Sequence, residues 1–108
     1  MRKALIPLAA ALLIASIAGV ATLASAASEP VKVKNYSFGP RTVTIEEGDK
    51  VVWQNKAGHH TVTFKKGSFD KSLSGDDRVS RKFPESGTYR YFCRPHKALG
   101  MKGKVVVE

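Results

Sequence analysis

Residues 93–101 read Cys93-Arg94-Pro95-His96-Lys97-Ala98-Leu99-Gly100-Met101, so a thiol, an imidazole and a thioether lie within nine positions. Soft sulfur ligands combined with imidazole select copper or zinc over harder ions. In copper sites that transfer electrons, two histidines and one cysteine bind the metal, and a methionine lies at a longer axial distance. The stretch supplies this set except for one histidine. A complete site therefore needs a fold that brings a second segment to this one.

The missing ligand has to come from His59 or His60, which lie well upstream. In residues 61–65 the apolar side chains Val62 and Phe64 occupy every second position. This alternation predicts a strand in which they face the core, while the two threonines and the lysine of the segment face outward. His60 shares the parity of the apolar residues. We therefore expect His60 to be the ligand and His59 to lie at the surface or the rim.

The same test applies to residues 89–93, where Cys93 has the parity of the two tyrosines and is predicted to point inward. Two inward-pointing ligands at strand ends would meet at one pole of a β core. The ring of Pro95 disfavours the α conformation for the residue before it. We therefore expect a loop rather than a helix after Pro95, and this loop can fold His96 and Met101 back over the metal.

Residues 93–101 resemble the copper-binding loop of the small cupredoxins, closest to plastocyanin and similar also to amicyanin and pseudoazurin. The resemblance continues through residues 47–55, 60–64, 87–89 and 103–107, and so spans nearly all of the chain after its leader. Plastocyanins and amicyanins usually carry Pro and often Asn where this chain has His59 and Thr61. The four residues between His96 and Met101 resemble plastocyanin and pseudoazurin more than the shorter loop of amicyanin.

The resemblance implies one copper ion that cycles between Cu(I) and Cu(II), with His60, Cys93 and His96 as ligands and Met101 as a weak axial one. It also implies that His96 shows its far edge to solvent and serves as the electron port. We expect the second ring nitrogen of His60 to bind a backbone carbonyl or a water, as is usual for metal-bound histidines.

Four protein ligands leave no open coordination position, unlike the three-ligand catalytic zinc sites. This argues against an enzyme and against a small-molecule substrate, and favours an electron-transfer protein. The alternative is a copper-binding chaperone or storage protein. Sites of that kind are usually open and rich in Met or His, whereas Met101 is the single methionine beyond the start of this chain.

The chain begins with the pattern of an export signal. Arg2 and Lys3 precede a run rich in Ala, Leu and Ile, and residues 24–26, Ala-Ser-Ala, form a small-residue cleavage site. We expect residues 1–26 to be a cleaved signal peptide, with the protein in the periplasm or another extracytoplasmic space. An uncleaved membrane anchor is the alternative, because the apolar run is nearly long enough to span a bilayer. Export favours a ligand role for Cys93, since a lone cysteine cannot form an intramolecular disulfide.

Residues 27–108 are expected to form one copper-binding domain. Seven short segments of alternating polarity, separated by turn residues, predict an all-β fold, a β-sandwich of about seven or eight strands. The resemblance implies the Greek-key arrangement of the cupredoxins. Residues 77–83 alternate poorly, because Arg81 has the parity of Val79 and Phe83, and we expect an edge strand there.

Charge indicates the kind of partner. The chain carries 18 Lys and Arg against 9 Asp and Glu, and removal of Arg2 and Lys3 leaves 16 cations and a net charge of +7. Such a field steers association with an acidic surface. We expect a monomer that exchanges electrons with a redox protein such as a cytochrome, oxidase, reductase or dehydrogenase. Nucleic acid is not expected as a partner, because an exported protein rarely meets it and no stacking platform is evident.

The surface around His96 is predicted to contact the redox partner. Three residues supply its apolar part and two its charged rim: Pro95, Ala98 and Leu99, with Arg94 and Lys97. An electron carrier has to release its partner readily. We therefore expect the small apolar patch to allow close approach and the rim charges to raise the association rate.

Overall fold

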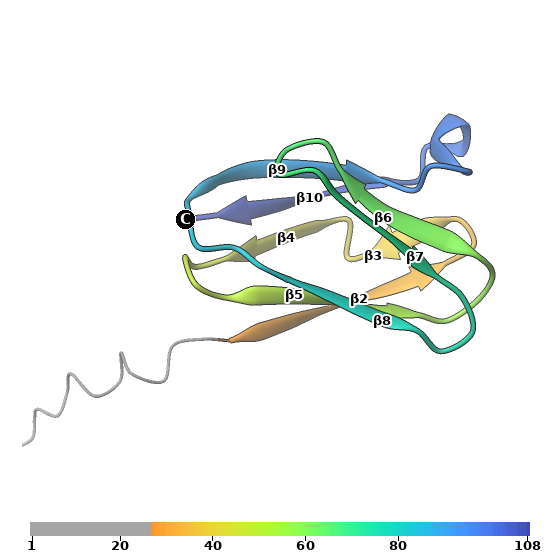
Figure 1. The fold of residues 1–108 in the computed structure, drawn as a ribbon, viewed down its shortest axis with the longest axis horizontal. Helices are drawn as coiled ribbons and strands as arrows, with labels where there is room; N and C mark the ends of the chain where they lie inside the picture. Colours follow the sequence, from red (N-terminus) through yellow and green to blue (C-terminus); the bar gives the residue numbers. More distant parts are fainter. Residues whose placement is uncertain (1–26) are drawn as a thin grey trace, which may run out of the picture.

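The alternating segments of the sequence form two mixed β-sheets that pack against each other as a sandwich (Figure 1). The computed structural model describes residues 27–108, and the predicted signal peptide of residues 1–26 lies outside them. Across this described part of the chain, no helix is long and apolar enough to cross a membrane. The prediction of an all-β sandwich is confirmed.

One sheet has five strands in the order β4-β10-β9-β6-β7. In that order they are β4 (Thr42–Ile45), β10 (Lys102–Val107), β9 (Gly87–Phe92), β6 (His60–Phe64) and β7 (Phe69–Leu73). β10 runs parallel to β4 and antiparallel to β9. β6 and β9 are antiparallel, with Phe64 opposite Tyr91. This pairing brings the start of β6 toward the end of β9, where His60 and Cys93 lie.

The other sheet has four strands in the order β3-β2-β5-β8. They are β3 (Ser37–Gly39), β2 (Ser28–Lys34), β5 (Lys50–Asn55) and β8 (Arg78–Lys82). Residues 27–108 thus form nine strands, where seven or eight were predicted. The additional strands are β3 and β7. β3 has only three residues and β7 buries only its last residue fully, so neither gives a clear alternating pattern.

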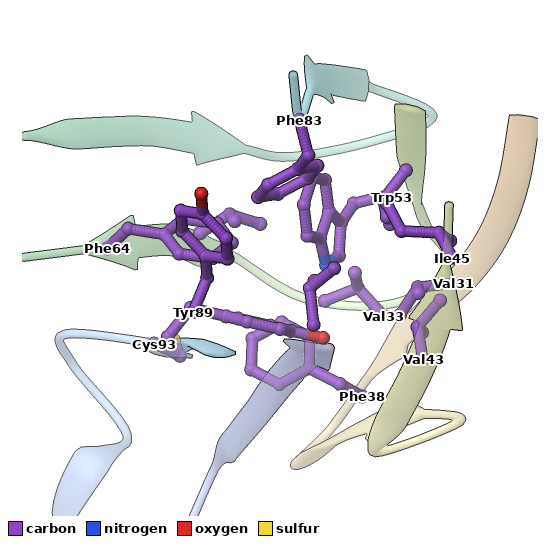
Figure 2. Packing of buried hydrophobic residues seen from close by; sticks show 14 of the residues in the cluster. Val31, Val33, Phe38, Val43, Ile45, Trp53, Phe64, Phe83, Tyr89 and Cys93 are labelled. Atoms are coloured by element: carbon purple, nitrogen blue, oxygen red, sulfur yellow. The ribbon is translucent and has the colours of Figure 1, made fainter. Parts of the chain in front are cut away.

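The core between the sheets is built on aromatic side chains. The ring of Trp53, from β5, lies with its centroid 5.7 Å from that of Phe64 and 5.3 Å from that of Tyr91, both from the opposite sheet. Figure 2 shows Trp53 and Phe64 among the other buried side chains of the core. Loss of a buried ring of this size costs about 3–5 kcal/mol of stability. This packing therefore fixes the position of β6 and β9, the strands that carry the candidate site.

The poorly alternating segment is an edge strand, as predicted, because β8 pairs with β5 alone. Its irregularity has a physical cause in Arg81, which points inward with Val79. The Arg81 guanidinium lies 4.6 Å from the ring centroid of Phe64 and 4.9 Å from that of Phe83. A guanidinium is planar and weakly hydrated, so it stacks on aromatic faces where an ammonium would stay in water. Arg81 therefore takes the place of an apolar residue at this edge.

The prediction that the threonines of β6 face solvent is wrong. Thr61 and Thr63 are only 5% and 9% exposed. Their hydroxyl oxygens lie 2.9 Å apart, and the Thr63 hydroxyl donates to Asp70 Oδ1 at 2.8 Å. The Arg94 backbone N–H donates to Thr61 Oγ1 at 2.9 Å. Neighbouring segments thus cover these hydroxyls. Such burial depends on tertiary contacts and cannot be predicted from the alternation of polar and apolar residues within one strand.

The segment after Pro95 is a loop apart from one 3-10 turn, η2 (Lys97–Leu99). Gly100 ends this turn with φ at 81°, a left-handed conformation that glycine adopts without steric cost. The turn reverses the chain so that β10 can begin directly after Met101. The predicted loop is therefore present, with three residues of helical turn inside it.

Candidate metal centre

Three side chains converge at one end of the sandwich. His60 begins β6, Cys93 follows β9, and His96 lies in the loop before η2. His60 Nδ1 lies 3.2 Å from His96 Nδ1, and Cys93 Sγ lies 3.7 Å from His60 Nδ1 and 3.4 Å from His96 Nδ1. The sequence predicted that these residues would meet, although the two histidines are 36 positions apart.

This triangle has the dimensions of a metal site. Bonds of about 2.0 Å to imidazole and 2.3 Å to thiolate, typical of zinc, place trigonal ligand atoms about 3.5 Å apart. The three measured separations lie between 3.2 and 3.7 Å. Two imidazole lone pairs at the shorter of these distances repel each other unless a proton or a metal ion lies between them. The donor set of two nitrogens and one sulfur is that of an electron-transfer copper site.

His60 is oriented for metal binding by the loop that precedes it. Its Nε2 lies 2.7 Å from the backbone oxygen of Ala57. Because a carbonyl only accepts, Nε2 carries the proton, and in the neutral ring the lone pair is on Nδ1, toward Cys93 and His96. Burial lowers the pKa of His60, which further favours the neutral form. The expected hydrogen bond to a backbone carbonyl is confirmed.

The loop that presents the Ala57 oxygen is itself fixed. The Asn55 side-chain nitrogen donates to Gly58 O at 2.8 Å and to Gly75 O at 3.0 Å. Gly58 has φ at 77°, and a Cβ at this position would collide with the Asn35 side chain and lie 3.1 Å from His60 Nε2. Only glycine therefore fits here without moving His60. The sequence marks Gly58 as a turn residue but does not reveal this contact.

Cys93 is fully buried, and its sulfur accepts a hydrogen bond from the Thr61 backbone N–H at 3.4 Å. The Thr61 hydroxyl accepts from the N–H of Arg94, the residue after the cysteine. Thr61 thus joins β6, which carries His60, to the segment after β9, which carries Cys93, through two hydrogen bonds. This residue occupies the position where the resemblance led us to expect Asn, and its hydroxyl still binds the ligand loop.

The loop is closed around the site by its own backbone. Cys93 N donates to Met101 O at 3.0 Å, Met101 N donates to His96 O at 3.4 Å, and Leu99 N donates to His96 O at 2.9 Å. Met101 is fully buried, while His96 is half-buried and His59 is exposed. The predicted positions of His96 and His59 relative to the surface are therefore confirmed. His59 is not part of the converging cluster, whose members are His60, Cys93 and His96.

Sequence reasoning missed Tyr36, which packs beside the site from the turn between β2 and β3. Its ring centroid lies 4.7 Å from that of His96, and the residue is 51% exposed. Tyr36 limits how far the His96 ring can tilt toward that side. A single aromatic residue in a polar turn carries no periodic signal, so only the fold reveals this contact.

The family model for "Copper binding proteins, plastocyanin/azurin family" matches residues 26–108. The chain belongs to this family of copper-binding proteins. It is 38% identical to chloroplastic plastocyanin of Tetradesmus obliquus over 110 aligned residues, which cover 86% of this chain and 76% of that protein. It is 41% identical to amicyanin-alpha of Methylorubrum extorquens, over 79% of this chain and 76% of that protein.

Solved cupredoxin structures have the same fold. An oxidized mutant of amicyanin superposes with a TM-score of 0.68 at 31% identity, over 74% of this chain and 81% of that one. A mutant plastocyanin of fern gives a TM-score of 0.66 at 26% identity, over 74% of this chain and all of the other. The resemblance to small cupredoxins is thus confirmed, and copper is the cofactor that fits the His60, Cys93 and His96 cluster.

Two surfaces include Lys97, the residue that follows His96. The first is the exposed segment around His96, where Leu99 is 64% exposed. At its rim, Arg94 forms a salt bridge with Asp70 at 3.1 Å. The Lys97 ammonium lies 4.4 Å from the Phe92 ring centroid. The second is a groove of about 730 Å³ that no Asp or Glu of residues 27–108 lines. Its cations are Arg41, Lys65, Lys66, Arg90, Lys97, Lys102 and Lys104. Lys97 borders both surfaces.

Proposed function

We propose that this cupredoxin is an exported, soluble electron carrier that binds one copper ion through His60, Cys93 and His96, with Met101 as a weak fourth ligand. Copper in such a site supplies a one-electron centre that alternates between its cuprous and cupric states. The observation that carries the proposal is the 3.2 to 3.7 Å triangle of ligand atoms, held by backbone hydrogen bonds on two paired strands.

Rigidity is the contribution of the protein to electron transfer. The ring of His60 is fixed by Ala57 O, and the sulfur of Cys93 is fixed by Thr61 N. Because both residues adjoin packed strands, the ligand positions change little when the charge of the site changes. Less rearrangement means a lower barrier to electron transfer, whether the geometry is imposed strain or intrinsic to copper–thiolate bonding.

A buried fourth ligand would leave no open position for a substrate, so we propose a carrier rather than an enzyme. Met101 is positioned for this role by its backbone bonds to Cys93 and His96 and by its complete burial. The half-buried His96 then forms the path for electrons, since Pro95, Ala98 and Leu99 around it are exposed and apolar. Such a surface allows close but short-lived contact with a partner.

The proposed partner is a redox protein with an acidic docking surface, met by a monomer of this chain. The net charge of +7 for residues 27–108 supports this choice, as does the groove of seven cations. We further propose that residues 1–26 direct export and are removed, which would place the carrier in the periplasm or another extracytoplasmic space.

Repeated redox cycling tests the proposed function. Copper-loaded protein would be reduced with ascorbate and reoxidised with ferricyanide for many cycles, in the presence of a copper chelator. An electron carrier should exchange one electron per copper in each cycle and retain its metal. Release of copper to the chelator on reduction would instead indicate a chaperone or storage protein and would refute the proposal.

A further inference from the structure

The end of the sandwich opposite the copper site contains a buried carboxylate bound to the first described residue. Asp49 is 6% exposed, and its Oδ1 accepts a hydrogen bond from Ala27 N at 3.0 Å. Its Oδ2 accepts from Glu46 N, also at 3.0 Å. The two backbone donors hold the pKa of this carboxyl below its usual range, so Asp49 is ionised at neutral pH.

Asp49 has no cationic partner among residues 27–108. The salt bridge in this part of the chain joins Arg94 to Asp70 instead. A carboxylate withdrawn from water is best stabilised by charged donors, because hydrogen bonds between ionised groups are shorter and stronger than those from neutral amides. Asp49 is therefore a carboxylate that a positive charge at the position of Ala27 N would stabilise further.

We propose that cleavage between residues 26 and 27 supplies this charge, so that the mature α-ammonium of Ala27 forms an ion pair with Asp49. Cleavage is a hydrolysis by a signal peptidase: water adds, the peptide C–N bond breaks, residue 26 leaves as a carboxylate and Ala27 keeps a protonated amine. The same nitrogen that now donates one neutral N–H then carries the charge. The inference rests on the proposed export and is independent of the bound metal.

The hydrogen bonds around Ala27 favour this residue as the first one of the mature chain. Ala27 O accepts from Lys50 N at 3.0 Å, and Ser28 then begins β2 opposite Lys50. A chain that started at Ser28 would lose both the donor to Asp49 and the acceptor for Lys50. A chain with one more residue would keep both hydrogen bonds but carry its charge away from Asp49. The fold thus distinguishes the mature terminus from its neighbours on either side.

Two measurements test the proposal. First, the full chain is expressed in a bacterium and the exported protein is weighed by mass spectrometry. The expected mass is that of residues 27–108, and any other first residue would overturn the assigned terminus. If no processed protein is found outside the cytoplasm, the export on which the inference rests is refuted. The result of the copper-cycling experiment does not depend on this outcome.

Second, urea unfolding at pH 6, where an α-amine is charged, compares copper-loaded chains of residues 27–108 and 26–108, both released from a tag by a protease. We expect the shorter chain to have an unfolding equilibrium constant about fivefold lower, because a charged donor is stronger than a neutral one. Asp49→Asn should remove this difference, while Glu29→Gln, a control for a nearby exposed acid, should keep it.

The proposal fails if the two chain lengths have equal stability, or if their difference persists in Asp49→Asn. Should Asp49→Asn not fold, acetylation of the Ala27 amine in the 27–108 chain replaces it. The acetylated chain retains an N–H at the same nitrogen but has no charge. It should match the 26–108 chain in stability, and a stability equal to that of the unmodified 27–108 chain would overturn the ion pair.

Discussion

The two ends of this β-sandwich solve the problem of buried polar groups in different ways (Figure 1). At the end that carries η2, the nitrogens of His60 and His96 and the sulfur of Cys93 face one another without enough donors among them. At the opposite end, each carboxylate oxygen of Asp49 has its own backbone donor. The first end therefore needs an ion from outside to be complete, whereas the second is completed by the chain itself.

Because of this difference, we expect metal binding to depend on one end of the sandwich and the stability of the fold to depend on the other. At the copper end the fold holds ligand atoms at distances that favour a cation. At the other end, Gly48 N donates to Phe83 O and Phe83 N to Asp49 O, so that the turn before β5 is bound to the residue that follows β8. Substitutions at the two ends should consequently have separable effects, one on copper and the other on stability.

The largest expected effect comes from removal of one ligand at the copper end. His60→Ala should lower copper affinity by more than about 100-fold. Loss of a residue that only hydrogen-bonds to a metal ligand already lowers metal affinity by about 10–100-fold. Titration with Cu(II) and a competing chelator measures the affinity. His59→Ala is the matched control, since His59 is exposed and outside the cluster. The ligand assignment is wrong if the control loses copper and His60→Ala retains it.

A glycine pair tests whether the fold, and not only the ligand types, prepares the site. Gly58→Ala should lower copper affinity by about 10-fold, because a Cβ there meets Asn35 and His60 and displaces the hydrogen bond that His60 Nε2 donates to Ala57 O. Gly48→Ala, at the opposite end of the sandwich, is the control. Its φ of 93° gives comparable backbone strain, but no atom lies within 4 Å of the added Cβ.

Equal copper affinity for Gly58→Ala and Gly48→Ala, measured by the same titration, would show that the geometry of the 56–59 loop does not prepare His60. Both variants should lose some stability. Their difference in copper affinity, rather than in stability, is the informative quantity.

Asp49→Asn should act at the opposite end and change stability without changing copper. The pKa of Asp49 is lowered by folding, so its stabilising effect is complete above the unfolded value of about 3.9 and is lost as pH falls through the folded value. Urea unfolding between pH 6 and pH 2 should therefore show a smaller loss of stability on acidification in Asp49→Asn than in the wild type. Equal pH dependence in the two proteins would contradict the assignment.

The smallest expected effect concerns which surface beside the copper end meets the partner. Arg94→Glu should slow electron transfer to an acidic redox protein only a few-fold, because Arg94 is already paired with Asp70. Lys104→Glu in the groove removes a cation that pairs with no Asp or Glu of residues 27–108, and should slow the reaction more at low salt.

Stopped-flow rates at increasing ionic strength measure both effects, which should shrink as salt screens the charges. A larger effect for Arg94→Glu than for Lys104→Glu would place docking at the His96 surface alone. The copper spectrum should be the same in both variants.

Sequence alone predicted the copper end well because its chemistry is local. Cys93, His96 and Met101 lie within nine positions, and parity selected His60 over His59. The exposure of Thr61 was predicted wrongly, since its burial comes from hydrogen bonds to a segment 33 positions away. Alternation within one strand cannot register such a partner.

The parts that sequence reasoning missed are those decided by tertiary contact. Tyr36 meets His96 only after the sheets have packed, and Arg81 enters a core position only because aromatic rings surround it. Asp49 has the pattern of an ordinary turn acid until the fold brings Ala27 to it. Short strands such as β3 escape detection because three residues give too little alternation.

The central claim, that the end bearing His60, Cys93 and His96 is a preformed copper–thiolate site, is tested most directly by the visible absorption spectrum of the protein loaded with Cu(II). An intense thiolate-to-copper charge-transfer band that colours the protein blue is predicted, with one copper per chain, and Cys93→Ser should abolish the band. A wild-type protein that binds Cu(II) without this band, or a Cys93→Ser variant that keeps it, would contradict the account.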